Sequence, residues 1–564
     1  MKLKNICKII VLVCLIQEFP AAQNYLERED IWVRGTMSDM TLDQKIGQLF
    51  MVRTYSKGNM EEERIISEFI TNYHIGGVCF FQGSPLYQVN LVNKYQQLSK
   101  IPLFVGIDGE FGLGMRFPGQ TISFPKQLML GAIKDDKLIY EMGTEIARQC
   151  KKTGININFA PSVDINNNQK NKVIYDRSFG ECPENVMSKG YMYMKAMEDE
   201  GILSCVKHFP GHGDTDVDSH IELPILTQSL PMLEMNAFYP FRRLASQGAG
   251  GMMVGHLHVP SIDDRTNRPT TLSEKVIKNI LRKDMGYKGL IFTDAMDMKG
   301  VTKYFPNGIA EAEAFMAGND VILLPQNLYK AISSIKEYIN SGKISIQRLN
   351  ESVERILRTK YKLGLQVTPF HHPEGLSVFL NRNKALALKQ KLTEAALTLV
   401  SDEDHIIPVK KTDEVHFATL SINVVKKTTF QRRVDDYISP RHYQLMPHQL
   451  NTNASQLIQT LSCFDVVLVS IHSSGRLNDF SKNLSDDLVK FLLELDSKTT
   501  VVISLFGSPY LLKNLTGLNN ILLCYNNDKI TQDIAAQSIF GANDITGELP
   551  VSVSEKWMVG YGLP

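Results

Sequence analysis

Residues 289–294, Gly-Leu-Ile-Phe-Thr-Asp, show most clearly the pattern that decides the fold. The run is apolar without alternation, which is typical of a parallel strand covered on both faces. Seven further runs of this kind are residues 47–52, 76–81, 103–108, 156–164, 203–208, 250–256 and 320–324. Amphipathic stretches between the runs are expected to be helices, among them 63–73, 136–153 and 273–285. Eight strands with crossover helices predict an α/β fold, a (β/α)8 barrel of the TIM type, with an open doubly wound sheet as the alternative.

The chain of 564 residues is too long for this barrel alone. We expect residues 23–365 to form the barrel and to be the catalytic domain. Residues 366–390 contain Pro369 and several polar side chains, and are interpreted as a linker. Apolar runs recur at 465–471, 500–505 and 520–524. Residues 391–564 are therefore expected to form a smaller C-terminal α/β sandwich domain.

The N-terminal residues resemble a targeting segment. Lys2, Lys4 and Lys8 flank the start of an apolar run at 9–16, and Pro-Ala-Ala follows at 20–22. This is the layout of a secretory signal peptide, and the run is too short to span a bilayer. We expect cleavage after residue 22 and a secreted or periplasmic mature protein. A lipoprotein anchored at Cys14 is the less favoured alternative.

Composition narrows the possible partners. The chain carries 61 basic and 60 acidic side chains, so its formal net charge is +1. That balance gives no electrostatic reason to expect nucleic acid as a partner. No later stretch is apolar enough for stable membrane insertion. The six cysteines beyond the N-terminal segment show no metal-ligand spacing.

Polar residues able to do chemistry follow several of the apolar runs. They are Asp108, Asp164, Lys207 with His208, His256 and Asp294. In a barrel the carboxyl ends of the strands share one face, where such enzymes place their active sites. An aspartate after a strand can also simply cap the next helix. Because so many runs end in this way, convergence on one pocket is the favoured interpretation.

Residues 207–220 read Lys-His-Phe-Pro-Gly-His-Gly-Asp-Thr-Asp-Val-Asp-Ser-His. The glycines and the proline preclude a regular helix, so this segment is expected to be a loop. In extended backbone, residues i and i+2 point to the same side, so Asp218 can reach the ring of His220. A carboxylate there fixes the tautomer of the histidine and raises its basicity. The pair is therefore a candidate general acid/base.

Metal sites are the alternative interpretation of this loop. Asp214, Asp216 and Asp218 lack the glycine and the terminal glutamate that a calcium loop of the EF-hand type needs. A zinc site could draw on His208, His212, His220, His256 and His258. No His-Glu-x-x-His motif or cysteine set accompanies these histidines, so zinc is the less favoured hypothesis. No metal and no organic cofactor is expected.

Asp294 is the candidate nucleophile. It ends an apolar run, so its carboxylate is expected on a rigid element at the barrel mouth, where it could attack an anomeric carbon. Asp297 is interpreted as a local hydrogen-bonding or capping group. The carboxylate of Asp108 can accept hydrogen bonds from sugar hydroxyls. The donor forks of Arg116 and Arg177 suit hydroxyl and acetamide oxygens.

These segments resemble those of glycoside hydrolase family 3, in its β-N-acetylglucosaminidase branch. Residues 207–220 match the signature K-H-F/I-P-G-H/L-G-x4-D-S/T-H at every position. Residues 292–296 resemble the family's nucleophile segment, and residues 107–116 and 177–180 resemble its sugar-binding segments. The chain differs after Asp108, where the branch often has His-Glu-Gly-Gly. The likeness extends over nearly the whole mature chain.

The resemblance implies a role for each matching residue. Asp294 is the implied nucleophile, His220 the acid/base and Asp218 its partner. The implied sugar-binding residues are Asp108, Arg116, Arg177, Lys207 and His208.

The implied activity is that of a retaining exo-β-N-acetylglucosaminidase, a β-N-acetylhexosaminidase that works through a covalent glycosyl-enzyme. Its substrate would be terminal β-linked N-acetylglucosamine on cell-wall fragments or chito-oligosaccharides. The alternatives are a β-glucosidase or phosphorylase of the same family and a non-catalytic sugar-binding protein, since a fold alone does not establish activity. The sequence leaves the choice of natural substrate, the disulfides, the oligomeric state and the role of the C-terminal domain open.

Overall fold

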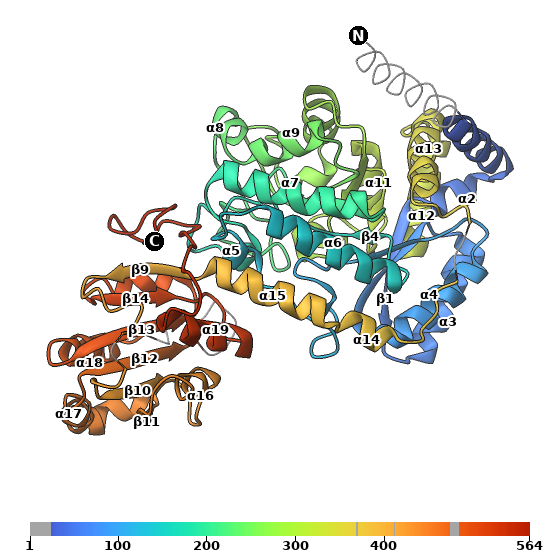
Figure 1. Cartoon of the computed structure of the whole chain (residues 1–564). Helices are drawn as coiled ribbons and strands as arrows, with labels where there is room; N and C mark the ends of the chain where they lie inside the picture. The colour runs from blue at the N-terminus through green and yellow to red at the C-terminus, as the bar shows by residue number, and fades with distance from the viewer. Residues whose placement is uncertain (1–23, 368–369, 411, 474–483) are drawn as a thin grey trace, which may run out of the picture.

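The computed structural model describes residues 24–564 except 368–369, 411 and 474–483. The predicted signal peptide at residues 1–22 lies outside the described residues. The chain forms two α/β units side by side, and the helix α15 (Asn383–Ala396) runs from the larger unit to the smaller one (Figure 1). No helix within the described residues has both the length and the apolar character needed to cross a bilayer.

The larger unit is the predicted barrel of parallel strands. The strands are β1 (Phe50–Ser56), β2 (Gly77–Gly83), β3 (Phe104–Ile107), β4 (Ile157–Asn158), β5 (Leu203–Phe209), β6 (Gly251–Val254), β7 (Leu290–Thr293) and β8 (Ile322–Leu323). They pair in the order β7-β6-β5-β4-β3-β2-β1-β8. A parallel bridge between Phe292 and Val321 joins β7 to β8. The α/β class and the TIM-type barrel are therefore confirmed.

Helices surround the strands of the barrel. They comprise residues 24–39, α2 (Leu42–Gly47), α3 (Met60–Tyr73), α4 (Pro85–Leu98), α5 (Gln127–Leu130), α6 (Lys137–Lys152), α7 (Pro183–Asp199), α8 (Leu230–Met235), α9 (Phe238–Ser246), Lys275–Asp284, α10 (Lys299–Thr302), α11 (Ile309–Ala317), α12 (Leu328–Asn340) and α13 (Ile346–Lys362), with 3-10 turns at Leu113–Met115, Tyr175–Arg177 and Thr270–Leu272. The three helices predicted by range are all present. In α6, for example, Ile139, Met142, Ile146 and Cys150 form one buried face.

Two strands differ from their predicted extents for local reasons. β1 starts at Phe50 rather than at residue 47 because α2 occupies the preceding residues, with Thr41 and Gln44 forming a capping box at its start. β4 covers two residues of the predicted 156–164. Pro161 has no amide hydrogen to donate, so the regular ladder is interrupted there, although Ser162 still forms a parallel bridge with Lys207.

The smaller unit is a six-stranded mixed sheet in the order β11-β10-β12-β13-β14-β9. Its strands are β9 (Thr398–Asp402), β10 (Phe417–Ile422), β11 (Arg441–Leu445), β12 (Val466–His472), β13 (Thr500–Phe506) and β14 (Asn520–Leu523). The sequence predicted β12, β13 and β14. Its helical segments are α16 (Thr429–Val434), Pro447–Gln449, α17 (Leu450–Leu461), α18 (Asp486–Asp496), Pro509–Asn514 and α19 (Lys529–Ile539). Neighbouring residues Val467 and Leu468 enter different core clusters, so both faces of the sheet are covered.

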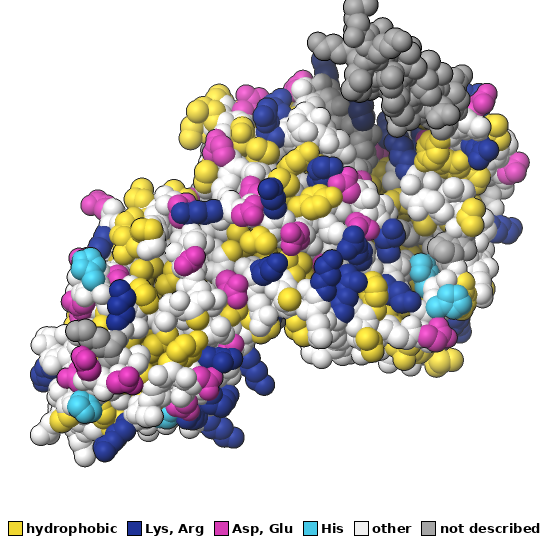
Figure 2. Space-filling view, viewed as in Figure 1, with side chains coloured by type: hydrophobic (Ala, Val, Ile, Leu, Met, Phe, Trp, Pro, Cys, Tyr) yellow, Lys and Arg dark blue, Asp and Glu magenta, His cyan; other side chains and the backbone are white. Residues whose placement is uncertain are grey.

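Polar contacts join the two units. The Tyr175 hydroxyl bonds to Ser508, and Asn166 Nδ2 donates to the Tyr510 hydroxyl at 3.1 Å. Residues 366–390, predicted as a linker, contain α14 (Leu376–Leu380) and the start of α15. The division of the chain at 365 and 390 stays a prediction. Basic and acidic side chains are interspersed over the visible face of both units (Figure 2).

Candidate active site

A cavity of about 540 Å³ lies at the carboxyl ends of the barrel strands. It is lined by seven of the eight predicted site residues: Asp108, Arg116, Arg177, Lys207, His208, His220 and Asp294. The eighth, Asp218, lies next to the cavity and contacts His220. Side chains from β3, β5 and β7 thus meet at one mouth, as the sequence predicts.

Asp294 follows β7 directly and is held by its backbone. Its amide donates to the Val254 carbonyl of β6 at 2.9 Å, and its Oδ1 accepts from the Ala295 amide at 2.8 Å. Burial alone would raise the pKa of Asp294, but His256 and His208 outweigh it and lower the pKa below its ordinary value. Asp294 forms no ion pair with the described residues. The carboxylate is therefore anionic and has an oxygen available to the cavity.

A buried charge network faces Asp294 from the other strands. Lys207 Nζ lies 2.8 Å from Asp108 Oδ1 and 2.8 Å from Glu110 Oε1. Arg177 donates two hydrogen bonds to Glu110, from Nη2 to Oε1 at 2.7 Å and from Nε to Oε2 at 3.0 Å. Arg116 pairs with the second oxygen of Asp108. Each group is thereby fixed in position by at least one opposite charge.

The network keeps its carboxylates ionised. Burial would raise the pKa of Asp108, but Lys207 and Arg116 bring that pKa down to about 2. Burial opposes ionisation of Glu110 too, and Arg177 and Lys207 again hold its pKa well below the usual range. These carboxylates are acceptors for hydroxyl donors at any ordinary pH.

His208 is oriented by Asp164. The ring nitrogen Nδ1 of His208 lies 2.7 Å from Asp164 Oδ2, and the same carboxylate accepts the His212 amide at 2.7 Å. This leaves Nε2 of His208 on the cavity side, 3.3 Å from Arg177 Nη2. Asp164, expected from the sequence among the converging groups, therefore acts from behind His208 and does not line the cavity.

The Asp218–His220 pair has the predicted geometry. Asp218 Oδ1 lies 2.8 Å from His220 Nδ1 and accepts the His220 amide, also at 2.8 Å. The side chain of His220 is 66% exposed, and that of Asp218 is 37% exposed. The Gly300 amide, at the start of the helix that follows β7, donates to the Ser219 carbonyl at 3.1 Å. The loop after β5 thus carries the histidine towards the strand that bears Asp294.

The sequence analysis did not single out Arg53 and Phe81, which both line the cavity. The Arg53 guanidinium lies 4.7 Å and that of Arg116 lies 4.4 Å from the centre of the Phe81 ring. Arg53 Nη1 pairs with Asp297 Oδ2 at 2.7 Å, so the expected local role of Asp297 is wrong. The residue at the cap of α10 is Met298. The signal for Arg53 was its place directly after the apolar run 47–52, and its partner is distant in sequence.

The histidines proposed for zinc have other contacts. His256 lies between Thr271 Oγ1, 2.8 Å from Nδ1, and the Ala295 carbonyl, 3.0 Å from Nε2. Among the residues that the structure describes, no group of three or more His, Cys, Asp or Glu side chains is arranged to hold a metal ion.

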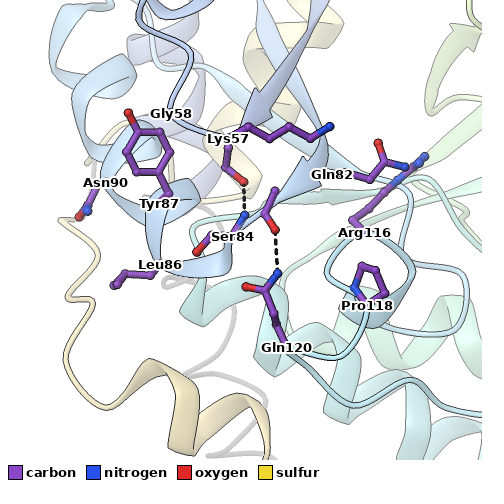
Figure 3. Close-up of a pocket in the computed structure, with 12 residues that line it drawn as sticks. Lys57, Gly58, Gln82, Ser84, Leu86, Tyr87, Asn90, Arg116, Pro118 and Gln120 are labelled. Atoms are coloured by element: carbon purple, nitrogen blue, oxygen red, sulfur yellow. Dashed lines mark hydrogen bonds between the residues drawn. The ribbon is translucent and has the colours of Figure 1, made fainter.

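A second hollow, of about 670 Å³, lies beside the cavity and shares Arg116 with it (Figure 3). Leu86, Tyr87 and Asn90 enter it from α4, whereas Gln82 and Arg116 lie together on its other side (Figure 3). This hollow lies at the ends of β1 and β2 and holds none of the predicted catalytic residues.

The fold and this site define a class: a (β/α)8 enzyme whose charged groups gather where the strands end at their carboxyl side. The family model described as the glycosyl hydrolase family 3 N terminal domain matches residues 41–359, more than half of the chain. The chain belongs to glycoside hydrolase family 3.

Individual relatives agree with this assignment. The chain is 31% identical to a protein named beta-hexosaminidase A from Pseudoalteromonas piscicida, over 62% of this chain and 63% of the relative. That match spans less than two thirds of the relative's length. It is 27% identical to a β-N-acetylglucosaminidase/β-glucosidase from Cellulomonas fimi, over 67% of this chain and 68% of the relative. The structure of a family 3 β-N-acetylglucosaminidase from Paenibacillus sp. str. FPU-7 superimposes with a TM-score of 0.76 at 26% identity, covering 91% of this chain and 99% of that one.

Proposed function

We propose that the chain is a retaining β-N-acetylglucosaminidase, with Asp294 as nucleophile and His220, supported by Asp218, as acid/base. One observation carries the proposal. Of the carboxylates that line the cavity, Asp108, Glu110, Asp176 and Asp297 all form ion pairs, whereas Asp294 forms none with the described residues. A nucleophile needs such a free oxygen, because a carboxylate committed to a cation attacks poorly.

The reaction runs in two steps. Asp294 attacks the anomeric carbon while protonated His220 gives its proton to the leaving oxygen, which breaks the glycosidic bond and forms a glycosyl-enzyme ester. Neutral His220 then takes a proton from water, whose oxygen attacks the same carbon and releases Asp294. The exposure of His220 suits this exchange, since the aglycone must leave and water must enter on its side.

The charged residues opposite Asp294 suit the sugar ring. β3 and β7 lie four positions apart in the ring of eight strands, so Asp108 stands across the mouth from Asp294. A sugar with its anomeric carbon at Asp294 would present its far hydroxyls to Asp108, Arg116 and Lys207. Arg177 and His208 complete this set of binding groups. Since the cations that line the cavity are paired with carboxylates, the site suits an uncharged sugar.

The names of the relatives support N-acetylglucosamine as the sugar, since several are called β-hexosaminidases. We infer terminal residues of cell-wall fragments or chito-oligosaccharides as substrates. The basic and apolar N-terminal segment supports export to a secreted or periplasmic location.

The test is an assay of the purified protein on para-nitrophenyl β-N-acetylglucosaminide and on the matching β-glucoside, with and without EDTA. The expected result is preferred turnover of the acetamido sugar, insensitive to chelation, with the β-anomer as the first product seen by proton NMR. Faster turnover of the glucoside would overturn the assignment of N-acetylglucosamine as the sugar. A first-formed α-anomer would overturn the retaining mechanism.

A further inference from the structure

His212 is a buried titratable side chain with no part in the reaction steps above. It lies within the same loop as His220 and is 1% exposed. Both of its ring nitrogens have hydroxyl partners: Thr215 Oγ1 lies 2.7 Å from Nδ1, and Ser219 Oγ lies 3.2 Å from Nε2. Ser219 stands between Asp218 and His220 in the chain. The imidazole therefore bridges the base of the loop and its reactive tip.

The bridge suits a neutral ring. Burial lowers the pKa of His212, and although Asp164 opposes this, the pKa settles at about 4. A neutral imidazole has one N–H and one lone pair, and a hydroxyl can act as donor or acceptor, so the two hydroxyls can satisfy both nitrogens. The Thr215 hydroxyl also donates to the His212 carbonyl at 3.0 Å. Asn171 Nδ2 donates a hydrogen bond to the same Thr215 hydroxyl at 3.3 Å.

His212 is also joined to the sugar-binding side of the cavity. Its amide donates to Asp164 at 2.7 Å, and Asp164 is the carboxylate that orients His208. The dyad itself has only its two internal short contacts, and on either side of it Asp216 accepts from Asn168 and Glu222 pairs with Lys303. Ser219, which lies between the two members of the dyad, contacts His212 through its side chain and Gly300 through its carbonyl.

We propose that His212 is a positioning residue, which holds Ser219 and so places the Asp218–His220 dyad for proton transfer to the leaving oxygen. The inference rests on the proposed role of His220. Proton transfer needs a donor and acceptor separation of about 2.6–3.2 Å. A loop tip freed by even about 1 Å misses this range, and such a misplacement lowers a rate by about 100-fold.

Three substitutions separate the two ends of the bridge. In His212→Gln the side-chain amide lies near the position of Nε2 and keeps a partner for Ser219. In His212→Asn the amide lies near the position of Nδ1 and keeps a partner for Thr215 only. His212→Phe preserves the ring shape and removes both. His258→Gln is the matched control, because His258 is a half-buried histidine that does not line the cavity.

The measurement is kcat/KM on two substrates: para-nitrophenyl β-N-acetylglucosaminide, whose leaving group needs little acid assistance, and N,N′-diacetylchitobiose, whose leaving group needs it. For His212→Phe and His212→Asn, we expect a fall of about 10- to 100-fold on the disaccharide and less than about threefold on the aryl glycoside. His212→Gln is expected to restore most of the loss. Ser219→Ala, which cuts the bridge from its other end, should reproduce the Asn pattern, and the control should change neither value.

An equal fall on both substrates in the His212 and Ser219 variants would overturn the inference, because lost folding removes active enzyme without regard to the leaving group. Unchanged disaccharide hydrolysis in these variants would overturn it too. His220→Ala is measured alongside them. If His220→Ala shows no dependence on the leaving group, the proposed function fails; if it does and the His212 variants do not, only the positioning role fails.

Discussion

The two halves of the candidate site are built in opposite ways. The strand half consists of Lys207 and Glu110, 3% and 0% exposed, together with Asp294 at the end of β7. Its groups are fixed by opposite charges and backbone amides. The loop half consists of Asp218 and His220, 37% and 66% exposed, whose short contacts are with each other. Rigid strands suit the groups that bind the sugar and attack carbon, whereas an exposed loop suits a group that must meet a departing aglycone and then water.

The largest effect is expected in the strand half, at the nucleophile. Asp294→Asn keeps the shape and removes the charge, so kcat should fall by about 10⁴-fold or more, as when a nucleophile is removed from other enzymes. Asp297→Asn is the matched control, since Asp297 lines the same cavity but is paired with Arg53. The fall in kcat for Asp297→Asn should stay near tenfold. Equal losses in steady-state assays of both variants would contradict the assignment of Asp294.

In the loop half, His220→Ala should lower kcat/KM on a poor leaving group by about 10²- to 10⁴-fold. Its melting temperature should stay close to that of the unmodified protein, because an exposed side chain with one local contact contributes little to folding. Calorimetry of the same preparation checks this. A melting temperature lowered as much as in a strand-half variant would show that the loop is part of the folded core.

Glu110→Gln tests the stability of the strand half. Removing this charge leaves Lys207 and Arg177 buried with less compensation, so the free energy of unfolding should fall by about 3–5 kcal/mol. Glu222→Gln is the control, since Glu222 pairs with Lys303 on the surface, where the loss of one ion pair changes stability little. Urea unfolding of both variants gives the comparison. Similar values for the two would mean that the buried network contributes no more than a surface pair.

The sequence predicted the strand half because position along a barrel strand implies position in space. Asp108, Lys207, His208 and Asp294 each end or follow an apolar run, and the carboxyl ends of parallel strands share one face. The Asp218–His220 contact was also predictable, because it depends on residues two apart.

Contacts between distant strands were not predictable in the same way. Nothing in the sequence pairs Arg53 with Asp297, which lie 244 positions apart, or places both Arg53 and Arg116 against Phe81. Glu110 lay in a segment already noted for Asp108, but its double contact with Arg177 depends on how the loops after β3 and β4 meet. The extents of β1 and β4 were missed because the helix that starts at Thr41 occupies the residues before β1, and the proline at 161 interrupts the regular ladder of β4.

The smallest expected effect is on how stability depends on pH, and it comes from His212, which contacts both halves of the site. The folded state lowers the pKa of His212 from about 6.5 to about 4, so as the pH falls the unfolded chain binds a proton before the folded chain does. The stability from this group is complete above pH 6.5 and is lost as the pH falls towards 4. Between pH 7 and pH 5 the loss should be about 2 kcal/mol.

His212→Gln removes the titrating ring, so urea unfolding of this variant should show a weaker fall in stability over the same range. Asp108 cannot account for the difference, because its pKa of about 2 places its own loss of stability at lower pH. The same dependence on pH in both proteins would mean that His212 titrates alike in the folded and unfolded states. The loop would then be open to water at its base as well as at its tip, and the contrast between a fixed half and an exposed half would extend down to Thr215.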